Sequence, residues 1–548
     1  MAVTAKLLSS LVKVFLDEEP TGMHVEKSEG FSNETVSFQV AFTDDIPHIT
    51  YMAKIIVESP IAEHVKLRSV QLIPHANTTP PADDYFLRTE PGLYPDRLAV
   101  TRDNWVTIYG GQWRSVWVDI YDAPTGVHPI KFTYKNYDGE ILAQCSTSVE
   151  IFPAALPLQN LRHTKWFHTD CLAEYYHVET WSERHWEIIG NFIETAVKRG
   201  INMVLTPTFT PPLDTAVGHE RLTTQLVEVT VTKGKYSFGF EKLRRWVNMC
   251  QNLGVEYFEI AHLFTQWGAK AAPKVMATVD GEYKRIFGWD TPALSEGYTT
   301  FLGAYLPALT GFMKEIGIDK SCYFHLSDEP GVGGKEDAAH YNAAMEVIAP
   351  YLKDFRIIDA LSDLELYKSG GIDTPVPCSY TVEAFLDVGM TEPWVYYCGA
   401  HQKDISNFFI TMPSARNRVL GLQLYKFGIR GFLHWGYNFY GSFHSLTPIN
   451  PYSSADATFW GFNANDGYQV YPGSDGKPEE SLRIMVFAQA IYDMRALQML
   501  ESLTDKAFVI NLMEEGIDEP ITFTKYPRGE EYLLILRQRV NDEIMKRI

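Results

Sequence analysis

The stretch "CYFHLSDEPG" (residues 322–331) is an apolar, strand-like run that ends on two adjacent carboxylates. Asp328 and Glu329 close the run, and Pro330 and Gly331 then break it. Three interpretations of the pair are open: a solvated strand end, a metal site or a catalytic pair. The choice between them depends on where this strand stands in the fold.

Strands and helices alternate on both sides of this stretch, from residue 160 onward. Residues 182–200, for example, carry one apolar helical stripe that begins after a candidate N-cap, Ser182, and ends near Gly200. Eight strand candidates, most of them separated by helix-like segments, predict a (β/α)8 TIM barrel in which 322–329 is the fourth strand. The eight candidates are 165–170, 201–207, 255–261, 322–329, 355–361, 374–380, 393–399 and 429–436.

Two insertions interrupt this regular pattern. Residues 225–240 predict a β-hairpin after the second strand, and residues 263–297 form a long insertion after the third. Both follow the C-terminal ends of strands, which is the face where barrel enzymes build their active sites.

The two ends of the chain predict further domains. Residues 1–155 show strand alternation and a hairpin signal at Asp138-Gly139, which favours an N-terminal β-sandwich. The runs "KAFVINL" and "EEYLLILRQRV" near the C-terminus predict a small β element. We therefore expect a sandwich in 1–155, the catalytic barrel in 160–500 and a β appendage in 501–548.

Composition excludes several classes of function. The net charge of −20 disfavours nucleic-acid binding and docking on anionic membranes, both of which rely on Lys and Arg. Six widely spaced cysteines without CxxC spacing argue against a zinc ribbon or a disulfide scaffold. Residues 1–20 contain neither a convincing signal peptide nor a transmembrane span, so we expect a cytoplasmic protein without membrane insertion.

The carboxylate pair suits glycoside hydrolysis, which needs an acid near the leaving oxygen and a group that stabilises the oxocarbenium-like state. Retaining barrel enzymes commonly place a carboxylate nucleophile on the seventh strand, but here that strand ends "VYYCGA" and the eighth ends "HWGYNFY". Glu392 precedes the seventh strand, at the wrong end of the barrel. A missing nucleophile suggests substrate assistance by a 2-acetamido group, with Asp328 orienting the acetamide and Glu329 as general acid/base.

Four stretches resemble glycoside hydrolase family 123, a group of bacterial proteins whose characterised members are β-N-acetylgalactosaminidases. They are "WFHTDCLAEYYHVETWSERHW", "YFHLSDEPG", "FRIIDALSDLELYKSGG" and "DGYQVYPGSDGKPEESLRIMVFAQAIYDMRALQML". The resemblance covers roughly residues 160–500 and places the consecutive Asp-Glu of the family on Asp328 and Glu329. It implies the substrate-assisted retaining mechanism. Typical secreted relatives act on glycans outside the cell, whereas a cytoplasmic enzyme would act on a small imported glycoside or oligosaccharide.

Polar residues near the first and third strands are candidate substrate contacts. His168 and Asp170 end the first strand as "HTD", where they bind sugar hydroxyls or form a strand-end hydrogen-bonded pair. A metal site is disfavoured because the ends of the fifth and sixth strands carry no histidines. His262 and Trp267 follow the third strand and line the cleft or pack the insertion.

The last two strands supply the remaining candidates. Strand alternation sends Tyr396 and Tyr397 in opposite directions, and we select Tyr397 to orient the acetamide oxygen. Aromatic rings suit the CH face of a galactose-type sugar. The candidates after the eighth strand are Trp435, Tyr437, Asn438 and Asp466.

Together these patterns predict an enzyme that releases β-linked N-acetylgalactosamine, or a related N-acetylhexosamine, with retention of configuration. It would take a carbohydrate substrate and need no cofactor or metal. One alternative is a glycosidase of the same fold that acts on a sugar without the acetamide, using water or a carboxylate such as Asp170 or Asp359. The other is a catalytically inactive carbohydrate-binding barrel.

Overall fold

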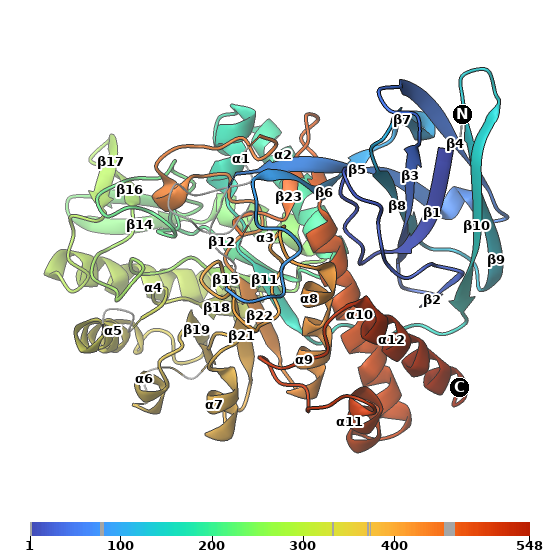
Figure 1. The fold of residues 1–548 in the computed structure, drawn as a ribbon. Coiled ribbons are helices and arrows are strands. Elements are labelled where there is room, and N and C mark those ends of the chain that lie inside the picture. The colour runs from blue at the N-terminus through green and yellow to red at the C-terminus, as the bar shows by residue number, and fades with distance from the viewer. Residues whose placement is uncertain (1–2, 77–81, 331–333, 370–371, 373, 454–465) are drawn as a thin grey trace.

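The computed structural model describes residues 3–76, 82–330, 334–369, 372, 374–453 and 466–548. Its N-terminal part is a sandwich of two five-stranded sheets, visible in blue at one end of the molecule (Figure 1). The first sheet has the order β1 (Val3–Ser9), β3 (Val36–Asp44), β8 (Arg114–Ile120), β5 (Val65–His75) and β6 (Gly92–Val100). The second has the order β2 (Lys27–Phe31), β10 (Ile141–Phe152), β9 (Gly126–Lys135), β4 (Thr50–Glu58) and β7 (Trp105–Tyr109).

Eight short parallel strands form a nearly closed barrel in the centre of the molecule (Figure 1). A backbone bridge between Cys378 and Tyr396 links its two outer strands, β20 and β21. Each strand overlaps one of the eight predicted segments, although the first ends at Lys165 and residues from Thr169 onward are helical. The strands are β11 (Arg162–Lys165), β12 (Met203–Thr206), β15 (Tyr257–Ile260), β18 (Cys322–Phe324), β19 (Arg356–Ala360), β20 (Thr374–Val376), β21 (Trp394–Tyr396) and β22 (Gly431–His434).

Helices cover the outside of this barrel (Figure 1). The helix after the first strand, α2 (Glu183–Lys198), begins where the Ser182 side chain accepts a hydrogen bond from the His185 amide, as its sequence predicts. The other main helices are α1 (Thr169–Tyr176), α3 (Glu241–Asn252), α4 (Glu296–Glu315), α5 (Lys335–Ile348), α6 (Leu364–Lys368), α7 (Val382–Asp387), α8 (Ser414–Arg418), α9 (Leu420–Lys426) and α10 (Leu482–Leu503).

The two insertions join into one small sheet. The predicted hairpin is present as β13 (Glu228–Thr232) and β14 (Lys235–Gly239). The second insertion forms another hairpin, β16 (Val275–Val279) and β17 (Glu282–Phe287), and β13 pairs with β16 in parallel. Pairing between the insertions was not predicted, because it joins residues far apart in the sequence, such as Thr230 and Thr278.

The predicted C-terminal β element is wrong, because this region is helical. Its two helices are α11 (Lys506–Glu514) and α12 (Glu530–Met545). Leu533, Leu536, Val540 and Ile544 recur at helical spacing in α12 and are all buried. A short apolar run fits either period, and packing against α10 decides in favour of the helix. In the described part of the chain, no helix combines the length and apolarity that crossing a bilayer requires.

Candidate active site

The carboxylate pair follows β18 in a segment that still bonds to its neighbour like a strand. The Leu263 amide donates to the His325 carbonyl at 3.1 Å, and the Phe264 amide donates to the Leu326 carbonyl at 2.9 Å. The regular conformation ends at Glu329, whose φ of 46° is left-handed. The turn breaks strand alternation, so that both carboxylates reach one cavity.

This cavity, about 120 Å³ in volume, opens where the barrel strands end. Aromatic rings make up much of its wall, which suits the apolar face of a sugar ring. The lining residues are Trp166, Leu213, Asp214, Gln266, Trp267, Asp328, Glu329, Ala360, Tyr396, Cys398, Leu433, Trp435, Phe439 and Phe443.

Hydrogen bonds from two neighbouring segments position the pair. The Tyr396 hydroxyl, at the end of β21, donates to Oε1 of Glu329 at 2.9 Å. The Trp267 amide donates to the Asp328 main-chain carbonyl at 2.8 Å. The seventh strand therefore offers Glu329 a phenol, where retaining barrel enzymes that carry their own nucleophile commonly supply a carboxylate.

Burial and charge set the protonation of the pair. Burial and the neighbouring Glu329 carboxylate raise the pKa of Asp328 well above its usual range, while the positive charge of His325 opposes this shift. A buried carboxyl group beside another carboxylate resists ionisation. Asp328 therefore keeps its proton to higher pH than an exposed aspartate does.

A buried ionic network lies beneath the pair. His325 contacts Oε1 of Glu259 through Nε2 and donates to Oδ1 of Asp359 through Nδ1, at 3.0 Å. Although burial disfavours the charged imidazole, Glu259 and Asp359 raise the pKa of His325 to about 9. Asp359 also accepts from the Tyr341 hydroxyl at 2.6 Å. These bonds fix a positive charge next to the chain that carries the pair.

One group in this network has the proximity of metal ligands. Ligand atoms of His262, His325 and Asp359 lie within 4.8 Å of one another, and neither ring nitrogen of His262 has a hydrogen-bond partner among the described residues. The His262 ring stacks on His325 at 4.3 Å between centroids. Both nitrogens of His325 already face carboxylates, so a metal would have to displace a proton and one of these contacts. The geometry fits an imidazolium network better than a metal site.

A third carboxyl group, Asp214, lines the cavity from the loop after β12. Burial raises its pKa to about 6, against the opposing effect of Arg221 and a hydrogen bond from the His444 amide at 3.0 Å. The place of Asp214 in the cavity could not be predicted from the sequence, because no periodic pattern shows which loop residues turn inward.

Two of the predicted aromatic contacts do lie in the cavity with the pair, namely Trp267 and Trp435. Asp466 lies behind Trp435 and accepts from its indole Nε1 at 2.5 Å and from the Gly399 amide at 2.7 Å. Asp466 therefore orients a wall residue and is not itself among the lining residues.

His168, Asp170 and Asn438 connect the first and eighth strands behind the cavity. Arg221 donates to both oxygens of Asp170, at 2.7 and 2.8 Å, and to Nδ1 of His168 at 3.0 Å. The His168 amide donates to Oδ1 of Asn438 at 2.9 Å, and His168 Nε2 donates to the Trp435 carbonyl at 2.9 Å. Their expected sugar contacts are not supported by this placement.

Three other predicted residues also lie outside the cavity lining. His262 is in the buried network, and Tyr437 donates from its hydroxyl to the Phe192 carbonyl at 2.9 Å, on the helix side. Tyr397 packs against Phe408 and Phe432. Alternation does separate the two tyrosines as predicted, but the selection of Tyr397 is wrong, because Tyr396 faces Glu329.

The remaining cavity residues come mostly from the strand ends and loops. Trp166 lines the cavity and donates from Nε1 to Glu259 at 2.6 Å, and strand alternation in 165–170 would have indicated it. Gln266 donates to the Thr215 carbonyl at 3.0 Å, which holds the two insertion-bearing loops together. Phe439, Phe443 and Cys398 have no comparable signal in the sequence.

An aromatic cavity at the strand ends of a parallel barrel, with two adjacent carboxyl groups in it, is typical of the class of barrel glycoside hydrolases. The profile of the glycoside hydrolase 123 catalytic domain matches residues 166–500. The chain belongs to glycoside hydrolase family 123, as the four quoted stretches indicate.

A solved structure shares this architecture. A family 123 glycoside hydrolase from Clostridium perfringens, described for its hydrolysis of glycolipid glycans, superposes with a TM-score of 0.73 at 12% identity. The match covers 100% of this chain and 98% of that chain. A family 39 glycoside hydrolase from Bacteroides cellulosilyticus matches at a TM-score of 0.34 and 11% identity, over 85% of this chain and 81% of that chain. Of the two TM-scores, only the value of 0.73 shows a shared fold. Among curated protein sequences, the comparison found no match.

Proposed function

We propose that the chain is a retaining β-N-acetylhexosaminidase, built on a TIM-type barrel, that releases β-linked N-acetylgalactosamine. One observation carries the proposal: Asp328 and Glu329 share a cavity in which the seventh strand presents Tyr396 to Glu329. A retaining enzyme with its own nucleophile needs a second carboxylate about 5–5.5 Å from the acid. Because a phenol occupies the seventh-strand position, a nucleophile from the substrate is favoured.

The two acids then divide the chemistry. Glu329 protonates the glycosidic oxygen as the bond to the anomeric carbon breaks, and the acetamide oxygen attacks that carbon to give an oxazolinium intermediate. Asp328 accepts a hydrogen bond from the acetamide N–H and stabilises the positive charge. Glu329 next removes a proton from water, which attacks the anomeric carbon and restores the β configuration. No cofactor enters these steps.

Substrate binding would also settle which acid carries the proton. An acetamide N–H directed at Asp328 favours the ionised form of that carboxyl group, since hydrogen bonds to a charged form stabilise it. Glu329 then carries the proton that the leaving group needs. The positive charge on His325 acts in the same direction.

The sugar would pack against the cavity's aromatic wall, with Trp435 or Trp267 beneath its CH face and Asp214 available to bind hydroxyl groups. The similar Clostridium perfringens enzyme is described for glycolipid glycans. A glycan of that kind ending in β-linked N-acetylgalactosamine is one candidate substrate. A free oligosaccharide with the same terminal sugar, as expected for a cytoplasmic enzyme, is the other.

Hydrolysis of p-nitrophenyl β-N-acetylgalactosaminide tests the proposal, together with inhibition by a thiazoline analogue of the intermediate. We expect turnover, competitive inhibition, and losses of about 10²–10⁴-fold in kcat/KM for both Asp328→Asn and Glu329→Gln. Glu392→Gln, at the opposite end of the barrel, is the matched control and should retain activity. An active enzyme that the thiazoline does not inhibit would refute substrate assistance.

A glycosidase acting on sugars without the acetamide is a second candidate, which Asp214 favours as a further carboxyl group in the cavity. The carboxylates first considered for this role are engaged elsewhere, Asp170 by Arg221 and Asp359 by His325. This candidate predicts faster turnover of p-nitrophenyl β-galactoside than of the acetamido substrate, and loss of that activity in Asp214→Asn.

A further inference from the structure

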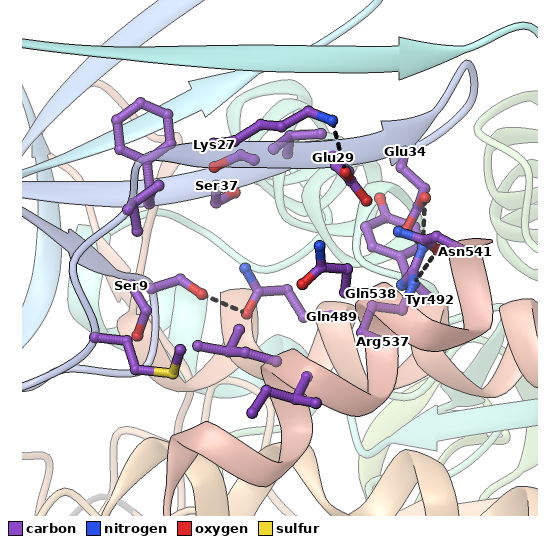
Figure 2. A pocket seen from close by; sticks show the side chains of 18 of the residues that line it. Ser9, Lys27, Glu29, Glu34, Ser37, Gln489, Tyr492, Arg537, Gln538 and Asn541 are labelled. Atoms are coloured by element: carbon purple, nitrogen blue, oxygen red, sulfur yellow. Dashed lines mark hydrogen bonds and ion pairs between the residues drawn. The ribbon is translucent and has the colours of Figure 1, made fainter. Parts of the chain in front are cut away.

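A second cavity, of about 430 Å³, lies between the β-sandwich and the C-terminal helices (Figure 2). Residues of β1, β2 and β3 form one side, and residues of α10 and α12 form the other. It shares no lining residue with the cavity of the carboxylate pair. Its volume falls within the range of about 300–1,000 Å³ that is typical of small-molecule sites.

Helix α12 spans this cavity because it is attached to the sandwich at two points. Near its start, Glu530 contacts the Ser9 hydroxyl and accepts from the Met23 amide at 2.6 Å. Two turns later, Arg537 donates to both oxygens of Glu34 at 2.7 Å. Residues three and four positions apart share a helix face. Leu534, four residues after Glu530 and three before Arg537, therefore lies on the same face as these attachments and lines the cavity.

The cations around the cavity are already neutralised. Arg537 also donates to Asp493 at 3.0 Å and to Oδ1 of Asn541 at 2.9 Å, so its guanidinium is fully engaged. Arg418 forms a bidentate pair with Asp493, at 2.7 and 3.0 Å. On the rim, Lys27 is paired with Glu29 at 2.9 Å and with a second glutamate. An anionic ligand would therefore have to displace existing ion pairs.

Neutral hydrogen-bonding groups, in contrast, are left open toward the cavity. Asn541 is 2% exposed and Gln489 is 8% exposed, and each uses its side-chain oxygen within the protein. Within the described ranges, Nδ2 of Asn541, Nε2 of Gln489 and the Gln538 amide have no hydrogen-bond partner. Oε2 of Glu29 is a buried atom without a partner among the same described residues. Asn541 and Gln489 are buried residues, whereas Gln538 is exposed. Because buried polar residues normally find partners for their polar groups, the open groups of Asn541, Gln489 and Glu29 indicate a ligand.

Part of the remaining wall is apolar. Met23 and Val25 line it from the sandwich side, and Leu534 and Ile535 line it from α12. Ile535 is 44% exposed, so its side chain is available for contact with a ligand. A site that combines amide and carboxylate groups with aliphatic side chains matches the hydroxyl groups and the CH face of a pyranose.

We propose that this cavity binds a neutral saccharide. The amides of Gln489, Gln538 and Asn541 donate to ring hydroxyls, and Oε2 of Glu29 accepts from one. The CH face of the sugar rests on Leu534 and Ile535. This site would hold a sugar on the enzyme at a place separate from the carboxylate pair, and it does not depend on the reaction catalysed there.

Soaking crystals of the full chain in N-acetylgalactosamine and in galactose tests the proposal. Density for a sugar is expected in this cavity, within hydrogen-bond distance of Asn541 Nδ2. In solution, saturation-transfer NMR should show weaker binding of both sugars to the double variant Gln489→Met/Asn541→Leu, by about tenfold for two lost hydrogen bonds. Activity on the nitrophenyl substrate should be unchanged in that variant.

Two further variants keep the result interpretable. Gln538→Leu breaks no hydrogen bond in the described structure, and it should weaken sugar binding even if the double variant folds poorly. Gln498→Met lies on the same helix as Gln489, outside the cavity, and should bind as the natural protein does. Sugar found only at the carboxylate pair, equal binding by Gln538→Leu, or binding of inorganic phosphate in place of the sugars would each overturn the proposal.

Discussion

Glu329 carries a left-handed backbone conformation that residues with a side chain rarely adopt. Such strain persists where the surrounding structure enforces it, and here Trp267 and Tyr396 hold the turn from two sides. This conformation brings the side chains of Asp328 and Glu329 into one cavity, whereas a regular strand would send them to opposite faces.

Tyr396→Phe removes the hydrogen bond to Glu329 and leaves the ring in place. Glu329 becomes charged as it gives its proton to the leaving group, and a hydrogen bond to a charged group contributes about 1.5–3 kcal/mol, so kcat/KM should fall by about 10–100-fold. Tyr397→Phe is the matched control, because the Tyr397 hydroxyl is buried outside the cavity lining and has no partner in the described part of the chain. Equal effects of the two substitutions would show that Tyr396 acts only through packing.

His325→Gln removes the positive charge beneath the pair and should change the pH profile. That charge lowers the pKa of Asp328, so its loss raises this pKa further and delays ionisation of Asp328 to higher pH. The acidic limb of kcat/KM should therefore move to higher pH. A profile that keeps its acidic limb in place, with only a lower maximum, would mean that His325 has a structural role alone.

The barrel strands could be predicted from the sequence because each is an apolar run bounded by turns, and their order fixes the position of "CYFHLSDEPG". Their ends could not be predicted. Strands of three to five residues, such as β18 and β19, stop before the functional residues, whose directions depend on loops. For this reason the sequence predicts the carboxylate pair at a strand end. It does not show that Tyr396 rather than Tyr397 faces Glu329, or that Asp214 lines the cavity.

The C-terminal helices show the opposite case. Their sequence predicts strands, whereas packing makes these segments helical. Leu536 is buried in α12, whereas Ile535 next to it is largely exposed. Leu536→Ala should destabilise the protein by about 2–5 kcal/mol, while Ile535→Ala should cost far less. Chemical denaturation of both variants measures this difference. Equal losses would be inconsistent with a helix that buries only one of these neighbours.

Buried ion pairs hold the sandwich against the barrel. Glu480, at the end of β24 (Pro478–Glu480), contacts Arg68 of β5 and Arg199 at the end of α2. Arg68 also donates to Asp119 of β8 at 2.5 Å. Although burial disfavours its charge, Arg199 and Arg68 lower the pKa of Glu480 below its usual range. One carboxylate therefore links three elements from two parts of the molecule.

Glu480→Gln removes the charged partner of the buried Arg199 and leaves Arg68 with Asp119 alone, and it should lower the free energy of unfolding by about 3–5 kcal/mol at pH 7. Because the folded-state pKa is lowered, the stabilisation by Glu480 is present above its unfolded pKa of about 4.3 and is lost as the pH falls. The difference between the natural protein and the variant should therefore shrink toward acidic pH. A difference independent of pH would contradict this origin.

The proposed catalytic mechanism depends on the substrate's acetamide acting as the nucleophile. Substrates whose N-acetyl group carries zero to three fluorine atoms weaken that nucleophile stepwise and leave the sugar ring unchanged. We predict that log kcat/KM falls steeply and linearly with the electron-withdrawing strength of the group. A flat series, with the trifluoroacetamide cleaved as fast as the acetamide, would contradict the mechanism.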